Sequence, residues 1–538
     1  MVLVACILGT TVVTVDSTAI NVALPAIAED LGGGLAGQQW TANAYLLTLS
    51  SLLLIGGSLG DVIGERRVFV AGVAGFGVTS VLCALAPTIE LLVVARALQG
   101  VSGALLTPAA LAVIVRTFPE SERGQAVGAW TAWGGIGTVL GPVVGGQLVD
   151  SASWRWIFLI NLPLVLGTLF IVSHAVPGDA PRQPGTRLDF VGAALCALGL
   201  AGITYGLIEQ PIRGFSDPLV AGALIGGAAL FASFIVYERR ASHPMLPLEL
   251  FKRHNFAAGN IETFAMYGGL SIVFFLLVLF LQGVAGYSAL AAGSASVPVT
   301  LVMFVLAARF GRLADRYGPR LFMGFGPLVC AVGLSLMLRL DADVDYRTEL
   351  LPALLIFALG LAIVVAPLTA TVLSDADEHN AGIASAVNNA IARVAGLVAI
   401  AAIGALVAAQ YDSRFDEALG AAGEQPAVRA AVEAMEPRPF AVERPPGLDP
   451  ALAEEVARAQ EEASVDSFHF GIGIAVVLVG LGGVLGLVGI RNPRRTVAAE
   501  GCPGGQLVGV PQEASHQSPC DWYRELPVVT LPARESTA

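Results

Sequence analysis

The sequence predicts an all-α protein that crosses a membrane many times. Three observations support this class: the composition, a series of long apolar segments and a duplicated turn. Of the 538 residues, 55% are hydrophobic and 13% are charged, and the mean hydropathy is +0.72. Soluble domains carry roughly 25% charged residues, so the chain is not a soluble globule. Lipid offers no hydrogen-bond partner to an open strand edge, and the spans should therefore be helices.

Fourteen apolar segments have about the length that a bilayer requires, roughly 20 residues. In chain order they are 2–26, 39–60, 68–86, 89–115, 125–149, 156–176, 189–208, 218–237, 255–280, 288–308, 321–339, 350–373, 381–408 and 467–490. The first segment carries Asp16 in its interior and has no basic leader before it. We expect it to be retained as a span and not removed as a signal peptide.

Two ten-residue blocks share the pattern Gly-x-Leu-x-Asp-x-x-Gly-x-Arg, and each lies between two apolar segments. The blocks are Gly57 to Arg66 and Gly311 to Arg320. Glycine permits close helix approach and positive φ, while Asp and Arg remain in water, which is typical of a tight turn at the membrane surface. We predict that these turns act as gates. Their residues are Gly57, Asp61, Gly64, Arg66, Gly311, Asp315, Arg316, Gly318 and Arg320.

The position of the two blocks predicts the domain organisation, because each would follow the second span of a six-span bundle. The expected parts are an N-terminal bundle at 1–176, a linker with two additional spans at 177–254, a C-terminal bundle at 255–490 and a disordered cytoplasmic tail at 491–538. Within the C-terminal bundle, residues 410–466 hold thirteen Asp and Glu against five Arg. We expect an acidic outer loop there, with an amphipathic helical stretch around 451–463.

Most Arg and Lys residues fall in loops on one side of the predicted spans, which places both termini in the cytoplasm of a multi-pass protein of the cell membrane. The sequence has no basic patch of the kind that binds nucleic acid and no phosphate-binding loop of the kind that binds ATP. The six cysteines show no metal-ligand spacing, so we expect no disulfide, no metal and no cofactor. We expect a monomer whose partners are the lipid bilayer, a small molecule and protons.

Three ionisable residues inside the predicted spans are candidates for proton coupling: Asp16, Arg96 and Glu262. A carboxylate at the bilayer centre costs about 2.5 to 3.5 kcal/mol, so Asp16 should face the bundle interior and take up a proton, although it could also only pack there. Arg96 could tune that carboxylate or bond the backbone of the first span. Glu262 could be a further proton or cation site, but we favour snorkelling to the interface.

Other polar side chains in the spans indicate a central cavity. The expected cavity residues are Asn21, Asn43, Tyr45, Gln99, Asn161, Asn388, Asn389 and Arg393, although interhelix bonding is equally compatible with Arg393. Aromatic side chains could supply the apolar walls, and the candidates are Trp130, Trp133, Phe264, Tyr267, Phe274 and Phe275. For any single one of them, a role in packing or in facing lipid is more common than contact with a ligand.

Several motifs together resemble the major facilitator superfamily and, within it, the fourteen-span drug:proton antiporters. They are the turn block, the Asp16-containing segment up to Pro25, the Arg96 segment, and Gly137-x-x-x-Gly141-Pro142-x-x-Gly145-Gly146 in the fifth span. The last is similar to the antiporter motif of exporters, although glycine-rich packing alone could produce it. The resemblance implies two six-helix bundles with two extra central spans. Val62 and Glu65 replace basic residues usual in the family, so a cytoplasmic latch would rely more on the second block.

This resemblance implies a secondary exporter that moves hydrophobic small molecules out by proton antiport, with the proton gradient as its energy source. The alternatives are an importer, a transport-dead sensor or scaffold on the same fold, and a polytopic membrane enzyme. The six histidines show no paired spacing that would favour an enzyme. The tenth span holds no acidic residue, from which we expect neutral or monocationic substrates.

Overall fold

The computed structural model describes residues 1–176, 178, 189–242, 244–374, 381–435 and 438–492. In these residues every regular element is a helix. Thirteen of the helices are long and apolar enough to cross a membrane, and they cover thirteen of the predicted spans. The remaining one corresponds to α2 (Gly34–Ile63), a 30-residue helix outside that set. The all-α membrane class is confirmed, whereas the total of fourteen spans stays a prediction.

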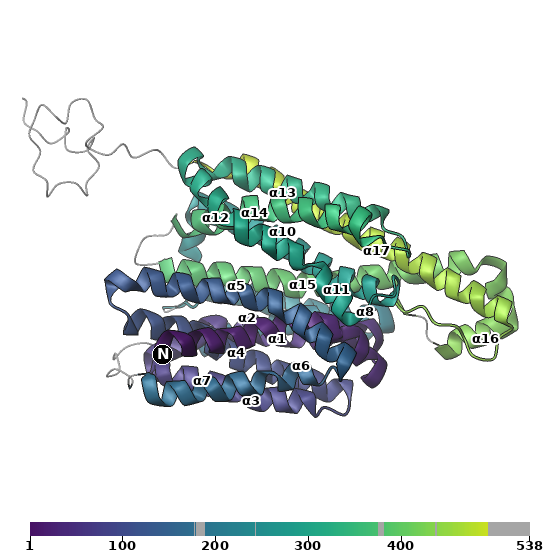
Figure 1. Ribbon diagram of the computed structural model, residues 1–538, viewed down its shortest axis with the longest axis horizontal. Coiled ribbons are helices and arrows are strands. Elements are labelled where there is room, and N and C mark those ends of the chain that lie inside the picture. The colour runs from purple at the N-terminus through teal and green to yellow at the C-terminus, as the bar shows by residue number, and fades with distance from the viewer. Residues whose placement is uncertain (177, 179–188, 243, 375–380, 436–437, 493–538) are drawn as a thin grey trace, which may run out of the picture. The chain divides into compact units, whose positions relative to one another are not determined.

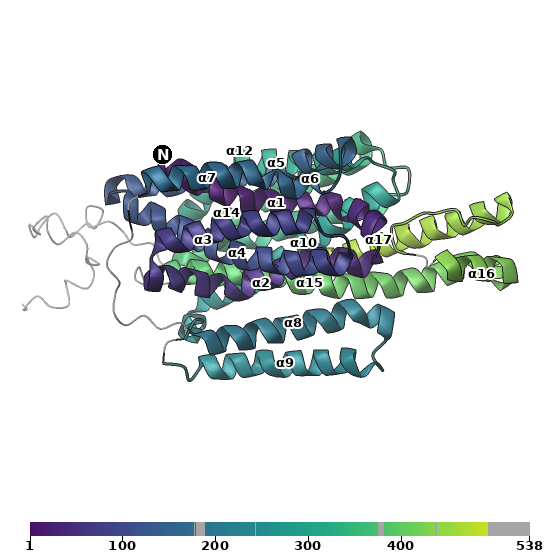
Figure 2. The same ribbon diagram turned by 90° about the horizontal axis from the view of Figure 1, so that it is seen from below.

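The first six predicted spans form helices α1 to α7, which lie side by side in Figures 1 and 2. Their bounds are α1 Val2–Leu31, α2 Gly34–Ile63, α3 Glu65–Ala84, α4 Ile89–Thr117, α5 Glu120–Ser151, α6 Trp156–Leu159 and α7 Asn161–Ala175. Buried side chains such as Val12, Phe69, Phe76 and Val113 form their shared core. The sixth span is interrupted at Ile160, so that Asn161 begins a new helix.

The last six predicted spans form helices α10 to α15 and α17. Their bounds are α10 His254–Gly283, α11 Ala289–Ala295, α12 Val297–Tyr317, α13 Pro319–Leu336, α14 Leu351–Ser374, α15 Ala381–Leu419 and α17 Pro450–Gly489. Short turns of helix at Leu248–Lys252, Met337–Arg339 and Tyr346–Leu350 adjoin them. The tenth span is divided at Ser296, two residues before Pro298, because proline has no N–H to continue the helix.

The two extra spans form a helical hairpin, α8 (Phe190–Arg213) and α9 (Pro218–Glu238). This hairpin lies along α2 and α15, as Figure 2 shows. Leu200 of α8 belongs to a buried apolar cluster with Leu397 of α15, and Trp40 of α2 donates a hydrogen bond of 3.1 Å to Glu209 of α8. The hairpin therefore contacts one helix from each six-span bundle.

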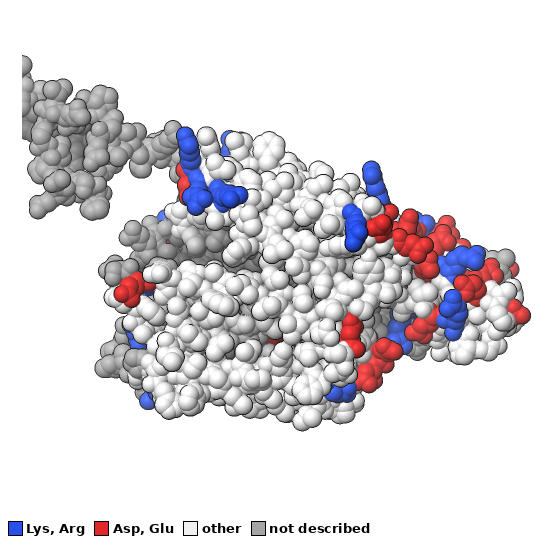
Figure 3. All heavy atoms as spheres, in the orientation of Figure 1, with Lys and Arg blue, Asp and Glu red and all other residues white. Residues whose placement is uncertain are grey.

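The acidic segment 410–466 is largely helical where it is described, and its position as an outer loop stays a prediction. Helix α15 continues to Leu419, α16 covers Pro426–Met435, and the predicted amphipathic stretch is the first part of α17. Tyr411, Val428 and Val456 are fully buried in a small cluster of their own. This apolar cluster packs the extended ends of α15 and α17 together with α16. Figure 3 shows charged side chains gathered on this extension and few on the bundle surface beside it.

We expect Gly227→Val to destabilise the protein because α8 and α9 touch at this glycine. A Cβ atom there would lie 2.6 Å from the Ile203 nitrogen and 2.8 Å from the Gly199 oxygen. Overpacking of this kind costs about 1–3 kcal/mol, so the thermal unfolding midpoint in detergent should fall. Gly226→Val is the matched control, since a Cβ atom there meets no atom within 4 Å. Equal midpoints for the two variants would contradict this packing.

Candidate functional site

A buried ion pair joins α1 to α4. The Nη1 atom of Arg96 lies 2.6 Å from Oδ2 of Asp16, and each side chain is about 1% exposed. Removing two charges from water costs several kcal/mol per ion, so a buried pair requires good geometry and further hydrogen bonds. The other polar contacts of both residues meet that requirement.

Asp16 is bonded through its second oxygen as well. Gln99 and Asn161 each donate to Oδ1 at 3.0 Å, and both amides also donate to the Ser80 hydroxyl, at 3.0 and 3.3 Å. The network thus connects α1, α3, α4 and the first residue of α7. Sequence analysis missed Ser80, because a serine in an apolar span is common and nothing in its spacing indicates a partner.

Arg96 has a structural contact in addition to the ion pair. Its Nε atom donates to the carbonyl oxygen of Thr41 at 3.2 Å, and its guanidinium carbon lies 4.4 Å from the centroid of the Tyr45 ring. The backbone partner is thus on α2, whereas the sequence suggested the first span. The first span also passes close to Arg96, so the rotation of α4 determines whether the guanidinium bonds the backbone of α1 or of α2.

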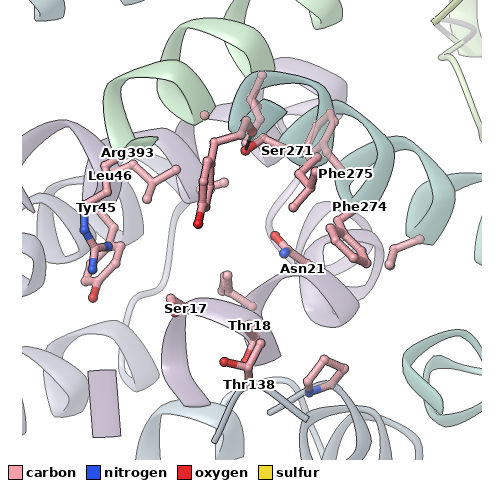
Figure 4. Close-up of a pocket in the computed structure, with 18 of the residues that line it drawn as sticks. Ser17, Thr18, Asn21, Tyr45, Leu46, Thr138, Ser271, Phe274, Phe275 and Arg393 are labelled. Carbon is pink, nitrogen blue, oxygen red and sulfur yellow. Dashed lines mark hydrogen bonds between the residues drawn. The ribbon is translucent and has the colours of Figure 1, made fainter. Parts of the chain in front are cut away.

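A cavity of about 440 Å³ lies between the two bundles. Its wall is formed by residues of α1, α2, α4 and α5 from the first bundle and of α10, α11, α12 and α15 from the second. Figure 4 shows Tyr45 and Arg393 on one side of the space, with Asn21, Phe274 and Phe275 on the other. The volume is in the range of small-molecule pockets, about 300 to 1,000 Å³.

Five residues expected at the cavity or at the coupling site line this space: Asn21, Tyr45, Arg96, Asn389 and Arg393. Of the aromatic candidates, Tyr267, Phe274 and Phe275 line it too. The hydroxyl residues of its wall were missed, because short hydroxyl side chains occur throughout the spans. They are Ser17, Thr18, Thr138, Ser271, Ser296 and Thr300.

Four predicted cavity residues lie elsewhere. Gln99 and Asn161 belong to the Asp16 network behind the wall. Asn388 donates from α15 to Asn260 and Thr263 of α10, at 3.0 and 2.9 Å, so it joins two helices. Asn43 is fully buried, and its amide atoms have no hydrogen-bond partner among the described residues.

Three aromatic candidates also lie away from the cavity wall. Trp130 donates a hydrogen bond of 2.8 Å to the Thr10 hydroxyl and packs α5 on α1. Trp133 and Phe264 are exposed on the helix surfaces, as side chains that face lipid are in a membrane protein. The sequence does not show the direction of these side chains, because it does not show how each helix is rotated.

Glu262 does not snorkel to the interface, which corrects the interpretation that we favoured. Its side chain is fully buried, and neither carboxylate oxygen has a hydrogen-bond partner in the described part of the chain. A Cβ atom added to Gly482 of α17 would lie 4.0 Å from its Cγ atom. The carboxyl group therefore faces the interior of the C-terminal bundle, and it does not line the central cavity.

The two duplicated blocks form equivalent turns. Gly64 (φ 105°) ends α2 and begins α3, and Gly318 (φ 91°) ends α12 and begins α13. Both values lie in the region that only glycine adopts easily, so the predicted positive φ is confirmed. Gly57 and Gly311, the first glycines of the blocks, face Pro108 of α4 and Ala366 of α14 at ordinary contact distance.

The polar residues of the blocks contact different helices. Glu65, one of the departures from the family pattern, pairs with Arg116 of α4 at 3.0 Å. Arg66 donates to the Val172 carbonyl at 3.4 Å, and Arg320 donates to the Leu487 carbonyl at 2.5 Å. The Arg316 guanidinium lies 5.4 Å from the ring centroid of Tyr317, and Asp315 is exposed. The side chain of Asp61 lies outside the described residues, and gating by these turns stays a prediction.

The glycines of the fifth span allow α5 to touch α1 along its length. Cβ atoms at Gly137 and Gly141 would collide with Thr14 and Thr18, and one at Gly145 would lie 2.8 Å from the Cβ atom of Ala19. Small residues permit such close backbone approach in membranes. The motif therefore has a packing role in this structure.

The same motif also reaches the second bundle. A Cβ atom at Gly146 would lie 2.6 Å from Cα of Leu290, and the Pro142 carbonyl lies against Gly293. One turn after the motif, both carboxylate oxygens of Asp150 accept hydrogen bonds from the Ala289 and Leu290 amides, at 3.0 and 2.9 Å. We call this carboxylate contact across the bundles the α5–α11 clasp.

Two further hydrogen bonds join the bundles near the same end. Gln39 donates to the Ile400 carbonyl at 2.5 Å, and Gln282 donates to the Val22 carbonyl at 3.0 Å. Together with the clasp they connect the bundles at the end where α1 meets α2 and α10 meets α11.

No group of three or more His, Cys, Asp or Glu residues that could hold a metal is found in the described residues. Their four cysteines, Cys6, Cys83, Cys196 and Cys330, are free and buried.

We expect Asp150→Asn to weaken the clasp, because the substitution removes the charge and one of the two acceptors. Hydrogen bonds to charged groups contribute about 1.5–3 kcal/mol, so the ratio of joined to separated bundle ends should fall by roughly tenfold. Distances between spin labels at Ala152 and Ala285 would report it, after the native cysteines are replaced. Asp217→Asn is the control, since Asp217 caps α9 within the extra hairpin. An unchanged distance distribution in Asp150→Asn would refute the role of the clasp.

Comparisons with known proteins agree with this architecture. The family model of the Major Facilitator Superfamily matches residues 6–400. The chain is 36% identical to the puromycin resistance protein pur8 of Streptomyces alboniger, over 72% of this chain and 78% of the relative. It is 35% identical to the tetracenomycin C resistance and export protein of Streptomyces glaucescens, over 77% of each chain.

Solved structures share the fold at low sequence identity. A bacterial homolog of the human lysosomal transporter Spinster aligns with a TM-score of 0.61 at 15% identity, over 92% of this chain and 98% of the other. A D-xylose–proton symporter aligns with a TM-score of 0.58 at 14% identity, over 91% and 97%. The family model and the relatives at 35% and 36% identity show that the chain is a multi-pass membrane protein of the Major Facilitator Superfamily, a secondary transporter and not an enzyme.

Proposed function

We propose that this transporter exports an amphiphilic or hydrophobic small molecule in exchange for protons. One observation carries the proposal: Arg96 is bonded to the buried Asp16 carboxylate and also forms part of the cavity wall. The position of the Arg96 guanidinium can therefore change both when a molecule binds in the cavity and when Asp16 binds a proton.

The relatives support export as the direction of transport. Besides the puromycin and tetracenomycin C proteins, they include a probable actinorhodin transporter at 36% identity and a cephamycin export protein at 34% identity. Their names describe resistance to, or transport of, puromycin, tetracenomycin C, actinorhodin and cephamycin. A compound of that kind is the substrate class we propose for this chain.

The coupling follows from competition for Asp16. With Arg96 at 2.6 Å from Oδ2 and two amides on Oδ1, a proton can bind only when these contacts loosen. A substrate that fills the cavity holds the Arg96 side chain against Asp16 and so favours loss of the proton, whereas a proton on Asp16 releases the guanidinium into the cavity and so weakens substrate binding. A proton affinity that differs between two states of the transporter is what coupling requires.

Alternating access requires the bundles to rock about the cavity. We propose that the end joined by the α5–α11 clasp faces outward, as the distribution of Arg and Lys residues indicates. The described state then opens towards the cytoplasm, where substrate would enter. Opening the other way breaks the clasp and the Gln39 contact, and the turns at Gly64 and Gly318 close the cytoplasmic end.

The proton gradient is sufficient for this work. One elementary charge that moves through 100 mV provides about 2.3 kcal/mol, which sustains roughly a fifty-fold concentration gradient of a neutral substrate. The proposal therefore requires no nucleotide or other cofactor.

We expect Asp16→Asn to abolish transport driven by a pH gradient while substrate exchange without a gradient continues. The amide keeps the shape of the carboxylate but cannot carry the proton. Coupling between two sites typically changes an affinity by about 5- to 150-fold. The pH-driven accumulation of a fluorescent naphthalene dye or of puromycin in proteoliposomes should therefore decrease by a factor of that size in Asp16→Asn.

Glu262→Gln is the matched control, because it removes another buried carboxyl group from a span of the described residues. If Glu262 is a second proton carrier, this variant still accumulates substrate but with fewer protons per molecule. Undiminished pH-driven transport by Asp16→Asn would refute the proposed coupling. Proton-driven movement in the opposite direction would indicate an importer, and no transport by the unmodified protein would indicate a sensor or scaffold.

A further inference from the structure

The described residues that line the central cavity carry positive charge and no negative charge. Among the residues that line it are two arginines, Arg96 and Arg393, and no Asp or Glu. The remaining polar residues are hydroxyl and amide side chains such as Ser17, Thr138 and Asn389. A cation in this space would find no carboxylate to pair with.

The two arginines differ in how their charges are compensated. Arg96 is paired with Asp16 at 2.6 Å. Arg393 lines the cavity from α15, and within the described part of the chain it makes no ion pair and no hydrogen bond. The uncompensated charge of the cavity is therefore that of Arg393.

Neither buried carboxyl group of the bundles is available to Arg393. Both oxygens of Asp16 are occupied, by Arg96 on one side and by Gln99 and Asn161 on the other. Glu262 is outside the cavity wall, with its Cγ atom towards α17. A partner for the Arg393 charge must then come from a molecule in the cavity or from water.

The surroundings of Arg393 suit an aromatic molecule. Figure 4 shows its side chain beside Tyr45, and Phe274 and Phe275 across the space. Tyr267 and Leu270 of α10 complete an apolar wall. A planar guanidinium binds carboxylate, sulfonate or phenolate oxygens through two parallel N–H groups, while the aromatic body of the ligand can lie against the phenylalanines.

We propose that the transported compounds are aromatic amphiphiles with an acidic oxygen group, which pairs with Arg393, and that lipophilic cations are disfavoured. This inference rests on the proposed function and specifies its substrate class. It replaces the expectation of neutral or monocationic substrates, which considered only the tenth span. The uncompensated charge comes from the thirteenth span and becomes evident only when the cavity wall is assembled.

The test uses two probes with the same aromatic body, the anion anilinonaphthalene sulfonate and the neutral N-phenylnaphthylamine. Their binding to the purified full-length protein in nanodiscs is measured by fluorescence. We expect the unmodified protein to bind the sulfonate more tightly. Arg393→Gln should weaken sulfonate binding roughly ten- to hundredfold, since a hydrogen bond to a charged group is lost, and should leave N-phenylnaphthylamine binding unchanged. Arg393→Lys keeps the positive charge but loses the two parallel N–H groups, so its affinity for the sulfonate should lie between those of the unmodified protein and Arg393→Gln.

Arg444→Gln is the matched control for the loss of one positive charge. Arg444 is exposed and pairs with Glu454, far along the chain from any cavity residue, so its variant should bind both dyes normally. Binding of the neutral dye shows that an Arg393 variant is folded. If Arg393→Gln does not fold, the comparison of the two dyes on the unmodified protein still decides the matter.

Two results would overturn the inference: equal or weaker binding of the sulfonate by the unmodified protein, or unchanged sulfonate affinity in Arg393→Gln. Transport in proteoliposomes separates this failure from failure of the proposed function. If a pH gradient drives the neutral dye or the cation rhodamine 6G through the protein regardless of Arg393, the exporter proposal survives and the substrate class is wrong. If a pH gradient drives none of the dyes, the proposed function itself fails.

Discussion

The ion pair between Arg96 and Asp16 is the interaction on which the rest of the site depends. A buried pair is retained only if its remaining polar atoms are satisfied, and removal of either partner leaves an uncompensated charge at a cost of about 3–5 kcal/mol. Here the amides of Gln99 and Asn161 and the Thr41 carbonyl complete the set. These bonds hold α1, α2, α4 and α7 in one register and bring a single guanidinium to the cavity wall. Under the proposed mechanism, the stability of the bundle and the coupling to protons depend on the same contact.

Small residues determine where the two bundles touch. In lipid there is little hydrophobic gain from bringing helices together, so close backbone packing has to supply the association. The glycines of α5 allow contact with α1 inside one bundle and, at Gly146, with α11 of the other. Asp150 then adds two hydrogen bonds from the Ala289 and Leu290 amides of α11. The fifth span is thus both part of the cavity wall and part of the contact whose opening would expose that cavity on the other side.

The sequence predicted the helices well and the site in part. Apolar runs of bilayer length have few alternatives to a helix, and the turn blocks require glycine at Gly64 and Gly318 whatever lies around them. The extent of α15 and α17 could not be predicted, because the cluster that contains Tyr411 and Val456 forms only after the chain folds back. The rotation of each helix determines which of its side chains face the cavity, and this rotation cannot be inferred from hydropathy. For that reason Glu262 was expected at the interface and is buried, and Asn388 was expected in the cavity but joins α10 and α15.

The central claim is that a ligand in the cavity and a proton on Asp16 compete through Arg96. Proton release on ligand binding tests it most directly, measured with a pH indicator on the purified protein in weakly buffered detergent solution. We predict that addition of a transported dye releases protons from the unmodified protein, and that Asp16→Asn binds the same dye with no release. Equal proton release by the two proteins would contradict the claim.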